Sequence, residues 1–231
     1  MKTLVAVIAL GLLAGSANAQ ASLGPQVSLG LWLNFDQTQS NTLDLQIPPV
    51  LGGGVRSTRL VGGAHTIVSF DLFSLISPQG LSVNVVIDEI RIAGESFDIF
   101  PGTPSGTLCV TGDPAGAGSG VLLLPLLAPP SVIADFHTQT FLTGPLGPFL
   151  PDGIRLAAHV EDQLQVDLLS LFRSNFQGGP AVVRTSATGT VPADVVFFGG
   201  APFALNVTLF NSFTPPADPL LTECDAFLGA R

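Results

Sequence analysis

The chain has 231 residues, with 17 acidic against 8 basic side chains, a net charge of −9 and a hydrophobic content of 46%. This apolar content excludes an intrinsically disordered chain, and the length suits a single domain with a substantial core. Lys2 is the only lysine, so the basic clusters that nucleic-acid binding requires are missing, and we expect no nucleic-acid partner.

The N-terminus has the pattern of a secretory signal peptide. Lys2 precedes the apolar run Leu4–Leu13, and Ala17-Asn18-Ala19 fits the small-x-small rule for cleavage. The run is about half of the roughly 20 residues that a spanning helix needs. We therefore predict cleavage of residues 1–19 at Ala19-Gln20, and a secreted or periplasmic location. We also predict a single β-rich domain over residues 20–231 and no transmembrane helix in the mature chain.

The first half of the mature chain is dominated by strand patterns. Apolar residues alternate with other residues in four segments, as expected for strands with one buried face. These segments are Val27–Phe35, Leu43–Ile47, Ala64–Leu72 and Leu81–Ile92. Gly52-Gly53-Gly54 predicts a break between the second and third, and a slip in the alternation at Asp88-Glu89 indicates a bulge or a turn.

The middle of the chain contains a loop and a more ambiguous region. Asp113–Gly120 is rich in glycine and predicts a loop, and Val121–Leu127, apolar throughout, predicts a strand buried on both faces. Ile154–Leu168 alternates around Glu161-Asp162-Gln163, which favours a hairpin that turns there. A helix over Leu156–Phe172 remains the alternative, because apolar residues also recur every four positions.

The end of the chain predicts two late strands and a helix. The strands are Val195–Phe198 and Ala204–Leu209. For the helix, Asp218 is a good N-cap and Pro219 suits the first helical position. Apolar residues then share one face, and Gly229 fits the end; this face comprises Leu220, Leu221, Cys224, Phe227 and Leu228.

The two cysteines, Cys109 and Cys224, favour a disulfide in an oxidising compartment. Such a bond would link the C-terminal helix covalently to the strands. The many short strands and turn signals predict an all-β, antiparallel fold, either a β-sandwich or barrel-like. The likeness of Asp71–Leu75 to Asp167–Leu171 leaves a duplication of two units open.

Catalytic motifs are weak in this sequence. Ser105 and Ser119 lie among glycines but lack the Gly-x-Ser-x-Gly spacing that presents a nucleophile on a tight turn. His65, His137 and His159 are each explained by the polar face of a strand or by a loop. We therefore predict no catalytic residue, and a non-enzymatic protein is favoured over a secreted hydrolase.

Metal and cofactor motifs are also weak. His159-Val160-Glu161 has the His-x-Glu spacing of zinc deaminases but lacks the companion Cys motif. A calcium pattern of alternating oxygens departs from the EF-hand loop; it comprises Asn34, Asp36, Thr38, Ser40 and Asp44. We therefore predict neither a metal-binding nor a cofactor-binding residue.

Two functions fit these expectations. The first is an exported structural or interaction protein, a matrix, appendage or cell-surface component, that self-associates through exposed β-edges. The alternative is a carrier of an apolar ligand such as a lipid, which the 16 phenylalanines and the apolar strands favour, because closed β-folds can enclose a ligand.

Overall fold

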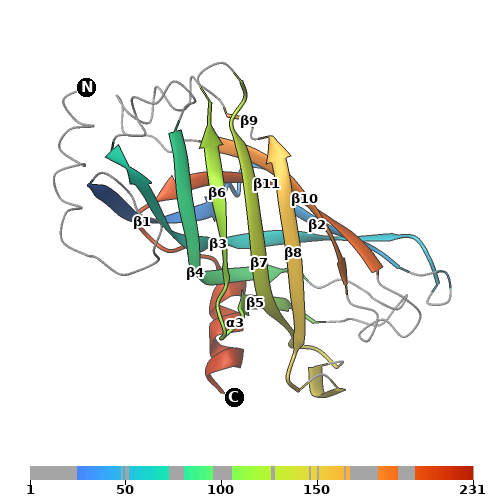
Figure 1. Ribbon diagram of the computed structural model, residues 1–231. Coiled ribbons are helices and arrows are strands. Elements are labelled where there is room, and N and C mark those ends of the chain that lie inside the picture. Colours follow the sequence, from blue (N-terminus) through green and yellow to red (C-terminus); the bar gives the residue numbers. More distant parts are fainter. Residues whose placement is uncertain are drawn as a thin grey trace.

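The computed structural model describes residues 25–47, 49, 52–72, 81–95, 106–125, 128–145, 147–149, 151–163, 165–166, 182–191 and 201–230. Within these residues, eleven strands form one antiparallel sheet, and a short α-helix lies near the C-terminus (Figure 1). The predicted all-β fold with a C-terminal helix is thus confirmed. None of the helices in this part of the chain has the length and apolarity needed to cross a bilayer.

The strands follow one another along the sheet in sequence order. Their bounds are β1 Gln26–Phe35, β2 Thr42–Gln46, β3 Val55–Asp71, β4 Leu81–Gly94, β5 Leu108–Gly112, β6 Gly118–Leu124, β7 Ser131–Leu142, β8 Ile154–Gln163, β9 Gln165–Val166, β10 Val182–Val191 and β11 Ala201–Ser212. A 3-10 turn, η3 Gly147–Phe149, precedes β8, and the helix is α3 Pro219–Gly229.

β1 and β2 are two halves of one strand position between β3 and β11, because both pair with these neighbours in the same direction. The chain between the halves is held by Asn41, which is 1% exposed. Its side-chain amide donates to the Asp36 carbonyl, and its oxygen accepts from the Thr208 backbone, both at 2.8 Å. Asn41 therefore replaces the ladder hydrogen bonds that the interruption removes.

β5 and β6 share a position between β4 and β7 in the same way. The residues between them, Asp113–Ala117, bulge outward as a turn. Both ends of this turn are hydrogen-bonded to the backbone of His137. The Asp113 N–H donates to the His137 carbonyl, and the His137 N–H donates to the Ala117 carbonyl, each at 2.9 Å. The register of β7 therefore continues without a shift past the turn.

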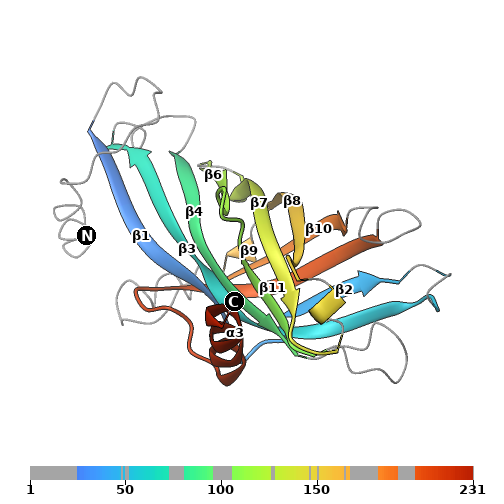
Figure 2. The same ribbon diagram turned by 90° about the horizontal axis from the view of Figure 1, so that it is seen from below.

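The sheet returns on itself. β9 follows β8 after a single residue, β8 is bonded to β7, and β9 is bonded to β10. β8 also lies against β10. The eleven strands thus occupy eight successive positions in an up-and-down order that ends beside β1, through the pairing of β11 with β1. The fold is therefore barrel-like, and Figure 2 shows the strongly curved sheet from below, with β1, β3 and β4 running to one side and β10 and β11 to the other.

One face of this curved sheet points inward and is largely apolar. At one end of the sheet a group of inward residues is buried. We call this region the closed end, and it comprises Phe35, Leu60, Leu108, Leu142 and Val207. Leu60, Gly94, Leu108 and Leu142 occupy paired positions across β3, β4, β5 and β7. Burial of such side chains contributes about 1.5–3 kcal/mol each, so this end supplies much of the stability.

α3 covers the outer side of the sheet near the closed end. Asp218 is its N-cap, accepting from Leu220 N at 2.9 Å, as its sequence predicted. The Cys109–Cys224 disulfide is formed, with both residues buried. It lies in an apolar cluster with Val61, Ala93, Phe141 and Leu221. At this end, therefore, apolar side chains pack on both faces of the sheet.

Several strand predictions are confirmed, and the slip in β4 is a bulge. The register of β3 with β4 shifts between His65 and Thr66, where Asp88 is the extra residue. The extra residue keeps Ile87 and Ile90 on the same inner face, where they share one cluster. Gly52-Gly53-Gly54 forms the predicted break, with positive φ at all three residues.

Other predictions are wrong. β8 runs straight through Glu161-Asp162-Gln163, so these residues form neither the predicted turn nor the alternative helix. The loop at Asp113–Gly120 ends early, because β6 begins at Gly118. Leu123 is 38% exposed, so this strand is not buried on both faces; its outer side faces solvent instead of a second layer.

Some predictions lie outside the described residues. They are the signal peptide at 1–19, the strand at Val195–Phe198, Ser105, and most of the two segments that suggested a duplication. They stay predictions, as does the single domain over residues 20–231.

Candidate functional site

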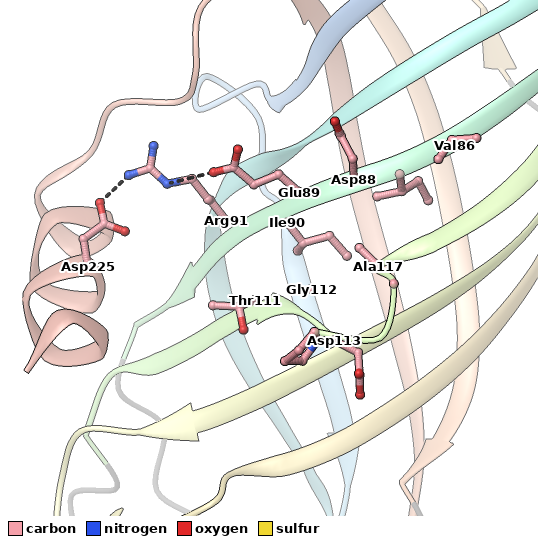
Figure 3. Close-up of a pocket in the computed structure, with 13 residues that line it drawn as sticks. Val86, Asp88, Glu89, Ile90, Arg91, Thr111, Gly112, Asp113, Ala117 and Asp225 are labelled. Carbon is pink, nitrogen blue, oxygen red and sulfur yellow. Dashed lines mark hydrogen bonds and ion pairs between the residues drawn. The ribbon is translucent and has the colours of Figure 1, made fainter. Parts of the chain in front are cut away.

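A shallow depression of about 600 Å³ lies on the outer face beside the β4 bulge (Figure 3). Its walls are the bulged part of β4, the turn between β5 and β6, and Asp225 of α3. The bulge turns Asp88 and Glu89 toward solvent, and both are exposed. The depression is therefore an open, solvent-exposed surface pocket lined by charged side chains.

The charges in this depression are paired with one another. Arg91 bonds to Asp225 on α3, and its Nε lies 4.0 Å from Glu89 (Figure 3). Asp113, on the opposite wall, lies 3.5 Å from Arg155 of β8. These groups hold α3 and the turn in place. Ion pairs this exposed contribute roughly 0–1 kcal/mol each and form no reaction centre.

Two of the three histidines pair with aspartates on the outer face. His65 Nδ1 lies 2.6 Å from Asp88, and His159 Nδ1 lies 2.8 Å from Asp135. The His65 ring also packs against Trp32, with ring centroids 5.4 Å apart. His137 is exposed on β7. The interpretation of polar strand positions fits His65 and His159, whereas His137, which the sequence placed beside a loop, lies within β7.

The structure brings Ser119 into the same row as one of these pairs. Ser119 pairs with Asp135, and Asp135 pairs with His159, across β6, β7 and β8. A nucleophilic triad requires the histidine between the serine and the carboxylate, so that it can take the hydroxyl proton. Here the aspartate occupies the middle. Ser119 and His159 therefore do not form the relay of a serine hydrolase.

The candidate metal ligands are engaged in local hydrogen bonds. Asp36 Oδ1 accepts from the backbone and hydroxyl of Thr38, at 3.0 and 2.7 Å, and Asp44 accepts from Ser57 at 2.5 Å. Asn34 donates to the Thr214 carbonyl. Among the described residues, no three His, Cys, Asp or Glu side chains gather closely enough to share one metal ion.

The inner face beyond the closed end mixes buried with partly buried side chains, and the buried ones include Val27, Val83, Ile87, Ile90, Ala134 and Val160. We call the row Leu29–Val68–Val85 the central layer; these residues are neighbours on β1, β3 and β4. All three are only partly buried. Leu29 lies on the part of β1 beyond its pairing with β11, which covers Trp32–Phe35. The same row continues through Gly120 to Ala134 and Val160, which are buried. Further inward apolar residues are partly buried too: Leu31, Leu33, Phe70, Leu122, Val132, Phe136 and Leu156.

The polar groups of this interior are few and mostly self-satisfied. Thr66 is 1% exposed and its hydroxyl donates to the Leu31 carbonyl at 3.1 Å. The Thr138 hydroxyl donates to the Leu156 carbonyl at 3.5 Å. Among the inward side chains that the structure describes between the closed end and the far ends of the strands, none is ionisable. The inner wall therefore offers apolar contact rather than polar chemistry.

Comparison of the chain with known protein families, with curated proteins and with solved structures finds no match. The interior and the outer face must therefore be interpreted from their own residues.

Sequence reasoning missed the central layer as a site because it considered motifs of polar residues. The signal was present in the alternation of the strands: Leu29, Val68 and Val85 all belong to segments predicted to have one buried face. The alternation does not predict how completely the inward face of these strands is buried, because burial depends on the distance to the strands on the opposite side of the curved sheet.

Proposed function

We propose that this chain is an exported, non-catalytic carrier that binds an apolar ligand inside the curved sheet. The observation that carries this proposal is the partial burial of the central layer. Leu29, Val68 and Val85 lie on the inward face and are partly buried, next to the part of β1 that has no pairing with β11. A ligand that covered them would gain roughly 25 cal/mol per Å² of apolar surface removed from water.

The distribution of charge supports the same proposal. Several acidic and basic groups of the described strands, such as Asp88, Arg91 and Asp135, lie on the outer face, whereas the inner wall is mostly aliphatic and aromatic; Arg56 of β3 shares the inward register of Leu60. Small-ligand sites are typically apolar concavities with few polar groups. An interior shaped this way suits binding by contact and exclusion of water, with no bond made or broken.

The experiment is a native mass spectrum of the full chain, expressed with its own N-terminus and recovered from the exported fraction without detergent. We expect cleavage after Ala19 and a monomer that carries the mass of a small lipid. Organic extraction should remove this mass, and refilling with the extracted material should restore it. A monomer without added mass that binds no apolar probe would contradict the proposal.

A second candidate, the structural or interaction protein, is favoured by an aliphatic stripe on the outer face. Ile67 pairs with Val86, and both are exposed, at 37% and 43%. Ile133 and Leu123, at 40% and 38% exposure, lie on the same outer face of β7 and β6, although the strand partner of Val86 is Ser119. Exposed apolar side chains that gather on one face can mark an interaction site.

Light scattering on the wild type and on a Val86→Ser, Ile133→Ser double variant separates this candidate from the carrier. Oligomers that the double variant loses would support association through the stripe. The strand pairings give less support to association through the edges of β3, β4, β6, β7 and β11, because each is bonded on both sides. Residues 26–31 of β1 pair with β3 alone and leave one edge open.

A further inference from the structure

We infer that the open edge of β1 is a contact surface for a second copy of this chain, and that two β1 strands pair there antiparallel about a two-fold axis. The contact lies on the backbone edge of the sheet, apart from the interior on which the proposed carrier function rests. It is also distinct from the apolar stripe on the outer face.

The open edge is the stretch of β1 that extends past the end of β11. Trp32–Phe35 pairs with β11, whereas residues 26–31 pair with β3 alone among the described strands. β11 ends at Ser212, and the chain then crosses the outer face, where the Thr214 carbonyl accepts from the Asn34 side chain. The residues that follow β11 therefore do not continue along the edge.

The hydrogen bonds of β1 show which backbone groups face this edge. On the side of β11, the Asp36 N–H donates to the Thr208 carbonyl. Successive residues of a strand direct their N–H and C=O groups to alternate neighbours, so every second residue before Asp36 faces the same side. In the open stretch these residues are Gln26, Ser28 and Gly30.

This edge is open to solvent and has no protection. Gly30 is exposed, and because glycine has no side chain, the exposed surface is backbone. Proteins usually protect an unpaired strand edge with charged residues, proline or a bulge. Residues 26–31 contain neither a charge nor a proline, and their register with β3 runs without a shift. The edge is therefore free to accept another strand.

The spacing of the edge residues makes this surface complementary to itself. In a two-fold antiparallel pair, Ser28 lies opposite Ser28 of the second copy, and Gln26 lies opposite Gly30. This register engages all the edge residues, and each pair of them exchanges two hydrogen bonds. Val27 then lies opposite Leu29 on the inward face, so apolar side chains meet apolar side chains and no like charges are brought together.

A side chain on the outer face favours the same register. His65 Nδ1 lies 2.6 Å from Asp88, and its Nε2 lies over Gly30, 3.2 Å from the place that a Cβ of this residue would take. Gln26 of the second copy lies opposite Gly30 on this outer face, where its side-chain amide can reach the His65 ring. A second copy of the chain therefore matches the edge in side chains as well as in backbone groups.

The contact is small, and it should be weak. Only one short strand from each copy takes part, and interfaces below about 1,200 Å² are typical of transient association. Both copies also carry a net negative charge. We expect a dissociation constant on the order of 100 μM. The chain should therefore be a monomer at the low micromolar concentrations of a native mass spectrum and a dimer near millimolar concentration.

The test is sedimentation velocity of the full chain from about 10 μM to about 1 mM, which brackets this dissociation constant. Ser28→Lys and Ser28→Glu should each weaken the dimer about fivefold or more, because identical charges then lie directly opposite each other. An equimolar mixture of the two variants should restore it, since unlike charges then face one another. Only a contact that pairs residue 28 with itself gives this rescue.

Ser69 provides the matched control. It is the β3 partner of Ser28 on the same outer face, one strand away from the edge. Ser69→Lys changes the net charge as Ser28→Lys does and should leave the dissociation constant within about twofold of the wild type. If the Ser28 variants fail to fold, hydrogen exchange of the wild type replaces them. The Ser28 and Gly30 amides should then gain protection between the lowest and the highest concentration.

Three outcomes would overturn the inference. The first is a wild-type chain that stays monomeric up to about 1 mM. The second is a dimer that persists in both Ser28 variants, or one that their mixture does not restore. The third is full protection of the Ser28 and Gly30 amides already in the monomer, because another segment would then cover the edge. None of these outcomes decides whether the interior binds an apolar ligand.

Discussion

The closed end and the central layer are both built from apolar side chains and share β1 and β3, but they are buried differently. On β3, Leu60 at the closed end is 3% exposed, whereas Val68 in the central layer is only partly buried. The closed end also has α3 packed on its outer side, around Ala93 and Cys109. Over the central layer the outer side carries Ile67 and Val86, which face solvent.

This difference separates two tasks within one sheet. Where both faces of the sheet are covered, the apolar side chains leave water completely and contribute their full burial free energy to folding. Where the outer face is open and the inner face is only partly covered, the side chains contribute less and leave apolar surface that another molecule can cover. The comparison can be tested by changing one region and measuring whether the other responds.

Removing the disulfide should have the largest effect. The Cys109→Ser, Cys224→Ser double variant should lose about 4 kcal/mol in free energy of unfolding, because the bond closes a sequence separation of 115 residues in the unfolded chain. Equilibrium denaturation in guanidinium measures this loss. Hydrogen exchange should rise first at α3 and β5, and a uniform rise across β1 and β3 would show that the two regions are not separate.

Matched leucine truncations compare the two regions directly. Leu60→Ala should cost about 2–5 kcal/mol, because it leaves a cavity among buried neighbours. Leu29→Ala should cost less than about half as much, since part of its side chain is already in contact with solvent. Urea denaturation of both variants gives the ratio, and equal losses would mean that the central layer is packed as tightly as the closed end.

The helix cap gives a smaller and more local effect. Asp218→Ala removes the oxygen that accepts from Leu220 N, and it should lower the free energy of unfolding by about 1 kcal/mol. Asp218→Asn keeps an acceptor and serves as the control, with a loss of a few tenths of a kcal/mol at most. Thermal unfolding followed by circular dichroism distinguishes the two variants, and equal losses would contradict a capping role.

The smallest expected effect has the opposite sign. Thr140 Oγ1, near the closed end, is buried without a hydrogen-bond partner. Thr140→Val replaces this hydroxyl by a methyl group and should raise the free energy of unfolding by roughly 1 kcal/mol. Thr138→Val is the matched control on the same strand, where the hydroxyl does donate to Leu156, and it should bring no gain. A loss at Thr140 would indicate a partner for its hydroxyl.

Sequence patterns predicted the strands whose inward residues are nearly all apolar and missed others. β1 and β4 alternate clearly, whereas β7 places Thr138 and Thr140 inward among apolar residues, and its alternation is correspondingly weak. β5 and β10 were missed for related reasons, since they are short or rich in threonine and serine. In β8 the charged residues at Glu161 and Asp162 indicated a turn, yet the strand continues because β7 pairs with it through Ser131.

The disulfide and the C-terminal helix were predictable because their signals are local or unique: one pair of cysteines, and a cap followed by proline. The closure of the sheet into a barrel-like fold could not be predicted with the same certainty, because it depends on the pairing of β9 with β10 and of β11 with β1. Such pairings join residues far apart in the chain. The central layer depends on this closure, so its partial burial could not be inferred from any single segment.

The outward turn between β5 and β6 is a suitable site for inserting additional residues. Asp113 and Ala117 are both bonded to His137, so the two ends of the turn are fixed by one residue whatever lies between them. Lengthening a surface loop costs only about 0.6 kcal/mol per doubling of its length. A peptide epitope or fluorophore tag inserted after Ala115, which is exposed, would be displayed on the surface while both half-strands keep their registers.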